Sequence, residues 1–239
     1  MQVVVPFAAT SPKTRLEGVL SSEERSTIAR AMLADVLGAL EETDRECEPT
    51  VVSTAPLSLS SALAFDFDFD FDFDSDSDFD SGNPTANVAD VTVEVDDRPL
   101  TDAVNARLES VGDGSDAVAV VMADLALATP AALERLFEPD ADVVVAPGRG
   151  GGTNALVVRH PEFRVDYHGA SYLDHREIAA GIGATLESVD SHRLATDIDE
   201  PSDLVEVLVH RSGGSTRACL REFGFELETS DGRVTVARE

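Results

Sequence analysis

Apolar and polar positions divide the chain into short apolar runs that alternate with segments of helical periodicity. The apolar runs predict buried strands at residues 3–7, 50–53, 91–95, 117–122, 143–147, 155–158 and 186–189. Apolar side chains spaced three or four residues apart predict helices over residues 21–40, 100–108, 172–182 and 199–210, and a further helix from residue 130. Strands that alternate with helices indicate an α/β fold of three layers around a mostly parallel sheet.

Local signals mark several of these elements. Ser21 and Glu24 form a capping-box pattern at the start of the first long helix. Near the C-terminus, Asp231 and Gly232 interrupt an alternating segment, which predicts a hairpin extension over residues 223–239. We expect the whole chain, residues 1–239, to form a single domain.

Residues 65–80 read FDFDFDFDFDSDSDFD, with aspartate at every second position. Strict alternation is typical of a half-buried strand, but dense aspartate opposes strand pairing by charge repulsion. The repeat also lacks the glycine turn and the varied ligands of a calcium loop. We expect a disordered acidic insertion over residues 65–81, with a strand extension and a contact surface for a partner as the alternatives.

The charge of the chain excludes several classes of partner. There are 46 acidic and 18 basic residues, a net charge of −28, and the eight aspartates of the repeat account for only part of it. Such a surface repels nucleic acid and anionic lipid, so neither is expected as a partner. A cationic partner or a salt-adapted host would explain the charge, and we favour a halophilic, high-salt cytoplasm, where ions screen self-repulsion.

Cysteine content and hydropathy indicate the compartment. The two cysteines, Cys47 and Cys219, form neither a disulfide framework nor a zinc pattern, which fits a reducing cytosol. No run approaches the roughly 20 apolar residues that a membrane span needs. The first residues do not have the pattern of a secretory signal. We therefore expect a cytoplasmic protein, and a homodimer, since dimers are the commonest soluble oligomers.

Two basic residues follow the first predicted strand. Lys13 is the only lysine of the chain, and Arg15 lies two residues after it. A lysine and an arginine on a loop before a helix are able to bind phosphates through charge-assisted hydrogen bonds. The alternative is a surface pair that flanks the helix.

Carboxylates follow the predicted strands at two further places. Asp124 comes directly after the strand at residues 117–122, and Asp197 and Asp199 form a D-x-D pair before the last helix. Alternate residues of an extended segment point the same way, so the pair is able to share one ion. Mg²⁺ prefers such oxygen ligands together with substrate phosphates. In a chain with 46 acidic residues, any single D-x-D also arises by chance.

Glycine-rich segments offer further anion sites. Residues 148–154 read GRGGGTN, and His168 to Ser171 read HGAS before a predicted helix. Glycines let backbone N–H groups approach an anion, and a helix N-terminus favours negative charge. A flexible connection and a simple N-cap are the respective alternatives. The chain has no G-x-S-x-G nucleophile motif. Phosphate-binding and carboxylate groups together indicate phosphoryl or nucleotidyl transfer.

The motifs, taken in order, resemble those of one family. Segments such as VMADLALAT, VVVAPGRGGGTNAL and DIDEPSDL make the chain similar to the 2-phospho-L-lactate guanylyltransferases of coenzyme F(420) biosynthesis, in a halophilic archaeal form. The similarity covers nearly the whole chain apart from the Phe-Asp repeat and the last twenty residues. It implies a Rossmann-like sandwich of the nucleotide-diphospho-sugar transferase type. It also implies a reaction of GTP with 2-phospho-L-lactate that yields lactyl-2-diphospho-5′-guanosine and pyrophosphate.

The resemblance also implies roles for individual residues. Lys13 and Arg15 would be catalytic groups at the GTP triphosphate, and Asn105 would lie near the nucleotide. Mg²⁺ or another divalent cation would be bound by Asp124, Asp197 and Asp199. The phosphorylated acid would be bound by Thr153, Gly169 and Ser171. Ala126 stands where relatives often have proline.

Three other functions stay open at this point. Relatives use phosphoenolpyruvate or 3-phosphoglycerate as the acceptor, so the phosphorylated acid is less certain than the reaction type. A guanylyl- or cytidylyltransferase for another small phosphate is a second possibility, and a non-catalytic nucleotide-binding module of the same fold is the third. No motif selects GTP over other nucleotides by physical argument alone.

Overall fold

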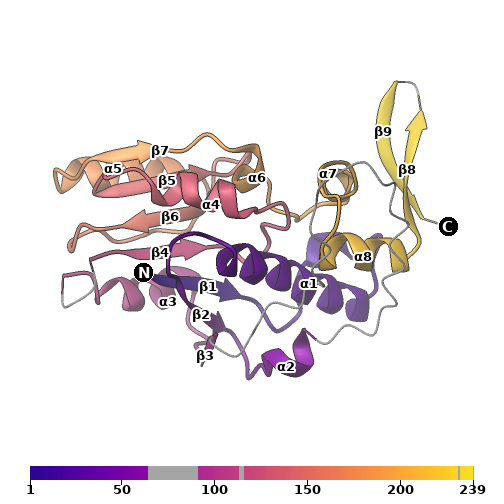
Figure 1. The fold of residues 1–239 in the computed structure, drawn as a ribbon, viewed down its shortest axis with the longest axis horizontal. Helices are drawn as coiled ribbons and strands as arrows, with labels where there is room; N and C mark the ends of the chain where they lie inside the picture. The colour runs from indigo at the N-terminus through magenta and orange to yellow at the C-terminus, as the bar shows by residue number, and fades with distance from the viewer. Residues whose placement is uncertain (64–90, 113–115, 231, 239) are drawn as a thin grey trace.

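The computed structural model describes residues 1–63, 91–112, 116–230 and 232–238 (Figure 1). The Phe-Asp repeat at residues 65–81 lies outside the described residues, and the expectations for it stay predictions. None of the described helices has the length and apolar character needed to cross a bilayer.

A seven-stranded sheet forms the centre of the molecule, in the order β3-β2-β1-β4-β6-β5-β7. The strands are β1 (Gln2–Phe7), β2 (Glu48–Ser53), β3 (Thr92–Val95), β4 (Val118–Val121), β5 (Val143–Pro147), β6 (Thr153–Val158) and β7 (Leu186–Ser188). All neighbouring pairs are parallel except those of β6, which runs antiparallel to both β4 and β5. The predicted, mostly parallel sheet is confirmed.

Helices cover both faces of the sheet (Figure 1). One face packs against α1 (Ser22–Glu41), α4 (Pro130–Phe137), α7 (Leu204–His210) and α8 (Ser215–Glu222). The other packs against α3 (Leu100–Leu108) and α5 (Ser171–Gly181). Four short segments complete the set: η1 (Thr14–Leu16), α2 (Leu59–Ala62), α6 (His192–Ala195) and η3 (Pro201–Asp203). The three-layer α/β architecture is as predicted.

Local sequence accounts for the long helix α1. The Ser21 hydroxyl accepts from the Glu24 backbone N–H, and the Glu24 carboxylate accepts from the Ser21 N–H, so the capping box is formed. The apolar face of α1, including Ile28 and Met32, is fully buried against the sheet. The helix is thus specified by its cap and its periodicity.

The sequence pattern did not predict α8, whose cap comes from a distant part of the chain. Asp35 of α1 is buried, and its carboxylate accepts from the backbone N–H groups of Ser215 (2.8 Å) and Thr216 (3.0 Å). Arg211 lies 3.1 Å from the same carboxylate. Gly214 has a φ of +102°, and a Cβ there would lie 2.7 Å from the Asp35 carboxylate. Because the capping group is 180 residues away, no local signal announces this helix.

The helix predicted over residues 199–210 is divided into η3 and α7. Beyond α8, strands β8 (Phe225–Ser230) and β9 (Arg233–Arg238) pair antiparallel in a separate two-stranded sheet, which extends away from the main body (Figure 1). Arg238 connects this hairpin to the body by donating to the Val19 carbonyl (2.9 Å) and by pairing with Glu24.

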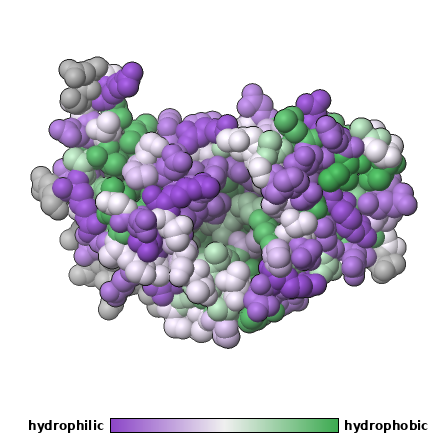
Figure 2. Space-filling view, turned by 180° about the vertical axis from the view of Figure 1, so that it is seen from behind, coloured by the Kyte–Doolittle hydropathy of each residue, from purple (hydrophilic) through white to green (hydrophobic). Residues whose placement is uncertain are grey.

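The sheet brings the loops after β1, β3 and β4 to one edge. These three strands are parallel neighbours or are joined through β2, so their C-terminal ends meet. Ligands of open α/β sheets bind at such an edge. Figure 2 shows that the face seen from behind is largely hydrophilic and is hollowed near its centre, where weakly hydrophobic residues form the floor.

Candidate active site

The loop after β1 holds Lys13 in a strained backbone conformation. Lys13 has φ 52° and ψ 46°, and Ser11 has φ 47°, both in the left-handed region that non-glycine residues rarely adopt. Such residues cost of order 1–3 kcal/mol each and cluster at functional sites. The conformation of this loop therefore has a cost in stability, and it directs the Lys13 side chain.

The Lys13 ammonium lies between two carboxylates. Its Nζ is 2.7 Å from Asp124 Oδ2, in the loop after β4, and 2.7 Å from Asp199 Oδ1, in the loop after α6. Arg15 Nη1 lies 3.0 Å from the second oxygen of Asp199. The structure thus brings together four of the predicted site residues from three separate parts of the chain.

The electrostatics of this group favour the charged lysine. Burial alone would lower the pKa of Lys13, but the neighbouring carboxylates Asp124 and Asp199 overcome that effect and hold its pKa above the ordinary value. Asp124 Oδ1 is buried and has no hydrogen-bond partner among the described atoms. An unpartnered buried carboxylate oxygen fits a site that binds a cation.

Asp197 is oriented differently from Asp199. Asn154 donates through Nδ2 to Asp197 Oδ1 (3.1 Å) and to the Leu194 carbonyl (3.0 Å). Gly148 leaves room for this amide, since a Cβ there would lie 2.5 Å from Asn154 Oδ1. Among the described residues, the three predicted metal carboxylates are not a group whose oxygens all lie within 4.8 Å of one another. Asp197 is thus fixed beside the Lys13 cluster and not in contact with it.

A buried aspartate fixes the segment that carries Asp199. Asp203 Oδ2 accepts from the backbone N–H groups of Asp199 (3.1 Å) and Glu200 (2.8 Å). Asp203 Oδ1 accepts from Arg149 (2.5 Å). The DIDEPSDL motif therefore combines the aspartate that pairs with Lys13 and the aspartate that positions its backbone.

Two cavities open beside the cluster. The first, of about 330 Å³, has Lys13, Asp124 and Asp199 in its lining and extends along apolar residues such as Phe7 and Val104. It also includes Asp96 and Arg98, which follow β3.

The second cavity, of about 220 Å³, has Thr153, Gly169, Ser171 and Asp197 in its lining. The two cavities share Leu100, Met122 and Asp124. The predicted residues for the phosphorylated acid thus line the cavity on one side of Asp124, and Lys13 lines the cavity on the other side.

His175 sets the direction of the Thr153 hydroxyl. The backbone N–H of Asp166 donates to His175 Nε2 (3.0 Å), so a neutral ring carries its proton on Nδ1. Nδ1 lies 2.9 Å from Thr153 Oγ1 and donates to it. Burial lowers the pKa of His175 to about 4, which keeps the ring neutral. The Thr153 proton is therefore available for a ligand in the second cavity.

Asn105 lies outside the lining of both cavities. Its Nδ2 donates to the Val165 carbonyl (3.0 Å), and its Oδ1 accepts from the Val165 N–H (2.8 Å). Both ends of the amide bind backbone, so Asn105 anchors the segment before Tyr167, and its contact with the nucleotide stays a prediction.

In the glycine-rich loop at residues 148–154, several of the backbone N–H groups bind carbonyls of the protein and are not free to bind an anion. The N–H groups of Gly148, Arg149 and Gly151 donate to the carbonyls of Gly152, Ala195 and Gly148, respectively. Of the loop residues, Gly152 and Thr153 line the second cavity. Most of this loop is thus a connection between strands, the alternative to an anion site.

The sequence analysis missed two features of the cavities. Asp96 holds Arg98 through both carboxylate oxygens, at 2.9 and 2.7 Å, and half of the Arg98 side chain is exposed (51%). Tyr167 lines the second cavity, and its buried hydroxyl has no partner among the described atoms. The position of Asp96 directly after β3 was a usable signal, because functional groups gather at strand ends. No local pattern marks Tyr167.

Comparison with known proteins gives consistent matches. A family described as "Guanylyl transferase CofC like" matches residues 1–56 and 79–239. A 2-phospho-L-lactate guanylyltransferase from Haloterrigena turkmenica is 63% identical over 245 residues, which cover 100% of this chain and 97% of that protein. The protein of the same name from Natrialba magadii is 61% identical, with 100% and 99% covered.

Solved structures support the fold alone. A protein assigned as a nucleotide-diphospho-sugar transferase from Desulfovibrio desulfuricans has a TM-score of 0.64 at 17% identity, and the match covers 92% of this chain and 94% of that one. A nucleotidyl transferase from Methanothermobacter thermautotrophicus has a TM-score of 0.50 at 15% identity, with 86% and 94% covered. The nucleotide-diphospho-sugar transferase type expected from the sequence is confirmed.

The buried neutral His175 makes stability depend on pH. An unfolded chain binds a proton at this ring below about pH 6.5, whereas the folded chain does so only near pH 4. The free energy of unfolding should therefore fall by up to about 3 kcal/mol from this residue as the pH is lowered through that window. Urea unfolding at constant salt should show a shallower pH dependence in His175→Gln than in the control His160→Gln. Equal slopes in the two variants would contradict the assignment.

Proposed function

The chain belongs to the CofC-like guanylyl transferase family, and from that premise we propose that it joins GTP to 2-phospho-L-lactate. The products are lactyl-2-diphospho-5′-guanosine and pyrophosphate, in coenzyme F(420) biosynthesis. One observation carries the proposal beyond the family: two cavities meet at Asp124, one lined by Lys13 and the other lined by Thr153 and Ser171. An enzyme that joins two phosphorylated substrates needs such a pair of adjoining sites.

The first cavity suits the nucleotide. Its apolar walls accept a flat base, and Lys13 at one end provides three donors for phosphate oxygens. Arg15, which is exposed over 68% of its side chain, provides a second cation beside Asp199. Arg98, held in place by Asp96, offers further donors to base acceptors such as O6 and N7 of guanine.

The second cavity suits a small phosphorylated acid. The Thr153 hydroxyl proton and the unpartnered Tyr167 hydroxyl are donors for carboxylate or phosphate oxygens. Ser171 begins the 11-residue helix α5, and Gly169 precedes it with a φ of +52°, so the helix N-terminus also favours an anion there. The acidic surface makes these local donors the main attraction for an anionic substrate.

The transfer is a substitution at the α-phosphorus of GTP. A phosphate oxygen of the acid forms the new P–O bond, and the bond between the α-phosphorus and its bridging oxygen to the β-phosphate breaks. The bonding electrons leave with pyrophosphate. No general base is needed, because the attacking phosphate is already an anion at neutral pH. Lys13 and Arg15 offset the charge on the leaving pyrophosphate, which is where most stabilisation is needed.

A divalent cation, Mg²⁺ in the first place, would be held by Asp124 and Asp199, with Asp197 beside them. When bound, it supplies positive charge that reduces the repulsion between the two anionic substrates. The unpartnered Oδ1 of Asp124 supports this ligand set. Lys13 would then exchange its contacts with the two carboxylates for the phosphates of the nucleotide.

The setting of the enzyme follows from its charge. A net charge of −28 supports a cytoplasm of high salt concentration, where the surface stays hydrated and self-repulsion is screened. Cys47 and Cys219, both free thiols, are consistent with that reducing compartment. The homodimer stays a prediction from the general frequency of dimers. Phosphoenolpyruvate and 3-phosphoglycerate remain the alternative acceptors, and a nucleotide-binding module without catalysis is the alternative class.

The acceptor is identified by pyrophosphate release from GTP and Mg²⁺ with a panel of phosphorylated acids. Release with 2-phospho-L-lactate should exceed release with phosphoenolpyruvate or 3-phosphoglycerate, and ATP or CTP should not replace GTP. Faster release with another acid would change the assigned acceptor and leave the reaction type as proposed. GTP binding without release for any acid would contradict the proposed activity.

Asp199 is the carboxylate on which both basic residues converge. We expect Asp199→Asn to lower kcat by at least about 100-fold, because the cation and the basic residues that Asp199 positions would no longer stabilise the developing negative charge, while the far-ultraviolet circular dichroism stays unchanged. Asp190→Asn makes the same substitution at an exposed aspartate nine residues earlier in the chain. It is the matched control, and its kcat should equal that of the wild type. If kcat of Asp199→Asn equals that of the control at saturating Mg²⁺, the assignment of Asp199 to the active site is wrong.

A further inference from the structure

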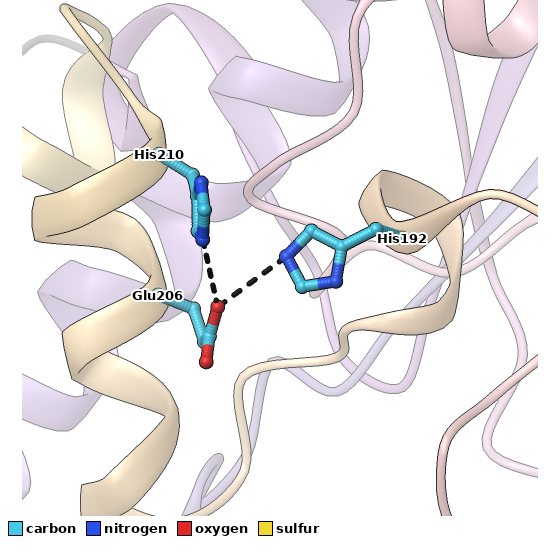
Figure 3. Close-up of side chains that lie close together, drawn as sticks. All are labelled: His192, Glu206 and His210. Atoms are coloured by element: carbon cyan, nitrogen blue, oxygen red, sulfur yellow. Dashed lines mark ion pairs between the residues drawn. The ribbon is translucent and has the colours of Figure 1, made fainter.

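A second group of possible metal ligands lies outside the two cavities. His192 of α6 faces Glu206 and His210 of α7, and the ligand atoms of all three lie within 4.8 Å of one another (Figure 3). Among the described residues of the chain, no other three His, Cys, Asp or Glu side chains meet this condition. None of the three lines either cavity. The activity proposed above does not use them.

The distances in this group match shared coordination better than hydrogen bonding. His192 Nε2 and His210 Nε2 each lie 3.3 Å from the same oxygen, Glu206 Oε2. Hydrogen bonds between nitrogen and oxygen usually measure about 2.7–3.2 Å. Ligand atoms at about 2.0–2.1 Å from a tetrahedral zinc ion are separated by about 3.3–3.4 Å. The two distances therefore match two edges of a tetrahedron around one ion, and the third pair of ligand atoms lies within 4.8 Å.

The chemistry of the three atoms points the same way. Two neutral imidazole nitrogens and a carboxylate oxygen would all present lone pairs to the same point, an arrangement that a cation stabilises. The opposite oxygen, Glu206 Oε1, lies 3.8 Å from Arg149 Nη1, which leaves Oε2 directed at the imidazoles. Two histidines with one carboxylate form a typical zinc ligand set, whereas Mg²⁺ prefers oxygen ligands alone.

The positions of the ligands in the fold are also suitable. Glu206 and His210 are four residues apart and therefore lie on one face of α7. The two imidazole rings have centroids 4.9 Å apart and an interplanar angle of 70°, so they are not stacked face to face. His192 and His210 are exposed over 50% and 44% of their side chains, which gives an ion an entry path and leaves a fourth position for water.

We propose that His192, Glu206 and His210 bind one Zn²⁺ or a similar transition-metal ion, separate from the divalent cation of the active site. The ion would join the segments that precede and follow Asp197 and Asp199. Those two aspartates lie between His192 and Glu206 in the chain, and Asp203 and Arg149 already fix the same segment. Bound metal would restrict the ends of the loop that carries the catalytic carboxylates, a positioning role.

Zinc binding to the full-length chain tests the proposal directly. Titration of the wild type with Zn²⁺, in a buffer of high salt and excess Mg²⁺ and without substrates, should show one tight binding site. His192→Gln and His210→Gln should each weaken the affinity by at least about tenfold, the lower range seen even for loss of an outer-shell partner of a metal site. Zn²⁺ should raise the Tm of the wild type and leave that of the double variant His192→Gln/His210→Gln unchanged.

Two controls make the outcome specific. His160→Gln removes a histidine outside the group, and Cys47→Ser removes a partly exposed thiol, a group of a type that zinc prefers. Both variants should retain the site. Without added Zn²⁺, circular dichroism should be the same for all variants, which separates loss of binding from loss of fold. Equal affinity in the wild type and the double variant, or no stoichiometric binding to the wild type, would overturn the proposal. Neither result bears on pyrophosphate release.

Discussion

The contact of the Lys13 ammonium with Asp124 and Asp199 is the interaction on which the site depends. It joins the loop after β1 to the loop after β4 and to the segment that follows α6. Each of these three segments is held by its own means: a strained left-handed backbone at Lys13, the buried end of β4, and the carboxylate of Asp203. The contact thus holds the three segments beside one another until Lys13 exchanges its two carboxylates for the phosphates of a nucleotide.

The same contact explains how so acidic a chain is able to bind two anions. The whole protein repels phosphates, yet its single lysine lines the first cavity, which meets the second at Asp124, and Arg15 pairs with Asp199 beside that lysine. On the acid side the attraction comes from neutral donors. Thr153 is oriented by the neutral ring of His175, and the Tyr167 hydroxyl is left without a partner. Charge is concentrated at the phosphates of the nucleotide, and directional hydrogen bonds serve the smaller substrate.

Much of this arrangement could be predicted from the sequence, because it depends on local patterns. The apolar strands and the rule that sites gather at strand ends indicated Lys13 and Asp124, and the D-x-D pair together with the family resemblance indicated Asp199. What could not be predicted depends on contacts between distant parts of the chain. Asp35 caps α8 from 180 residues away, and the proton on His175 is set by the backbone of Asp166. Asp197 appeared equivalent to Asp199 in the D-x-D pair, but Asn154 turns it to the other cavity.

The central claim is that Lys13 leaves its carboxylates to bind the GTP phosphates, and the affinity for GTP tests it most directly. Lys13→Met keeps the unbranched stem of the side chain, removes a charge-assisted contact worth about 1.5–3 kcal/mol, and leaves Asp124 and Asp199 to repel the nucleotide. The Kd for GTP in Mg²⁺ should therefore rise roughly 10- to 100-fold or more relative to the control Arg135→Met, an exposed residue of α4, with circular dichroism unchanged in both. An unchanged Kd in a folded Lys13→Met protein would contradict the account.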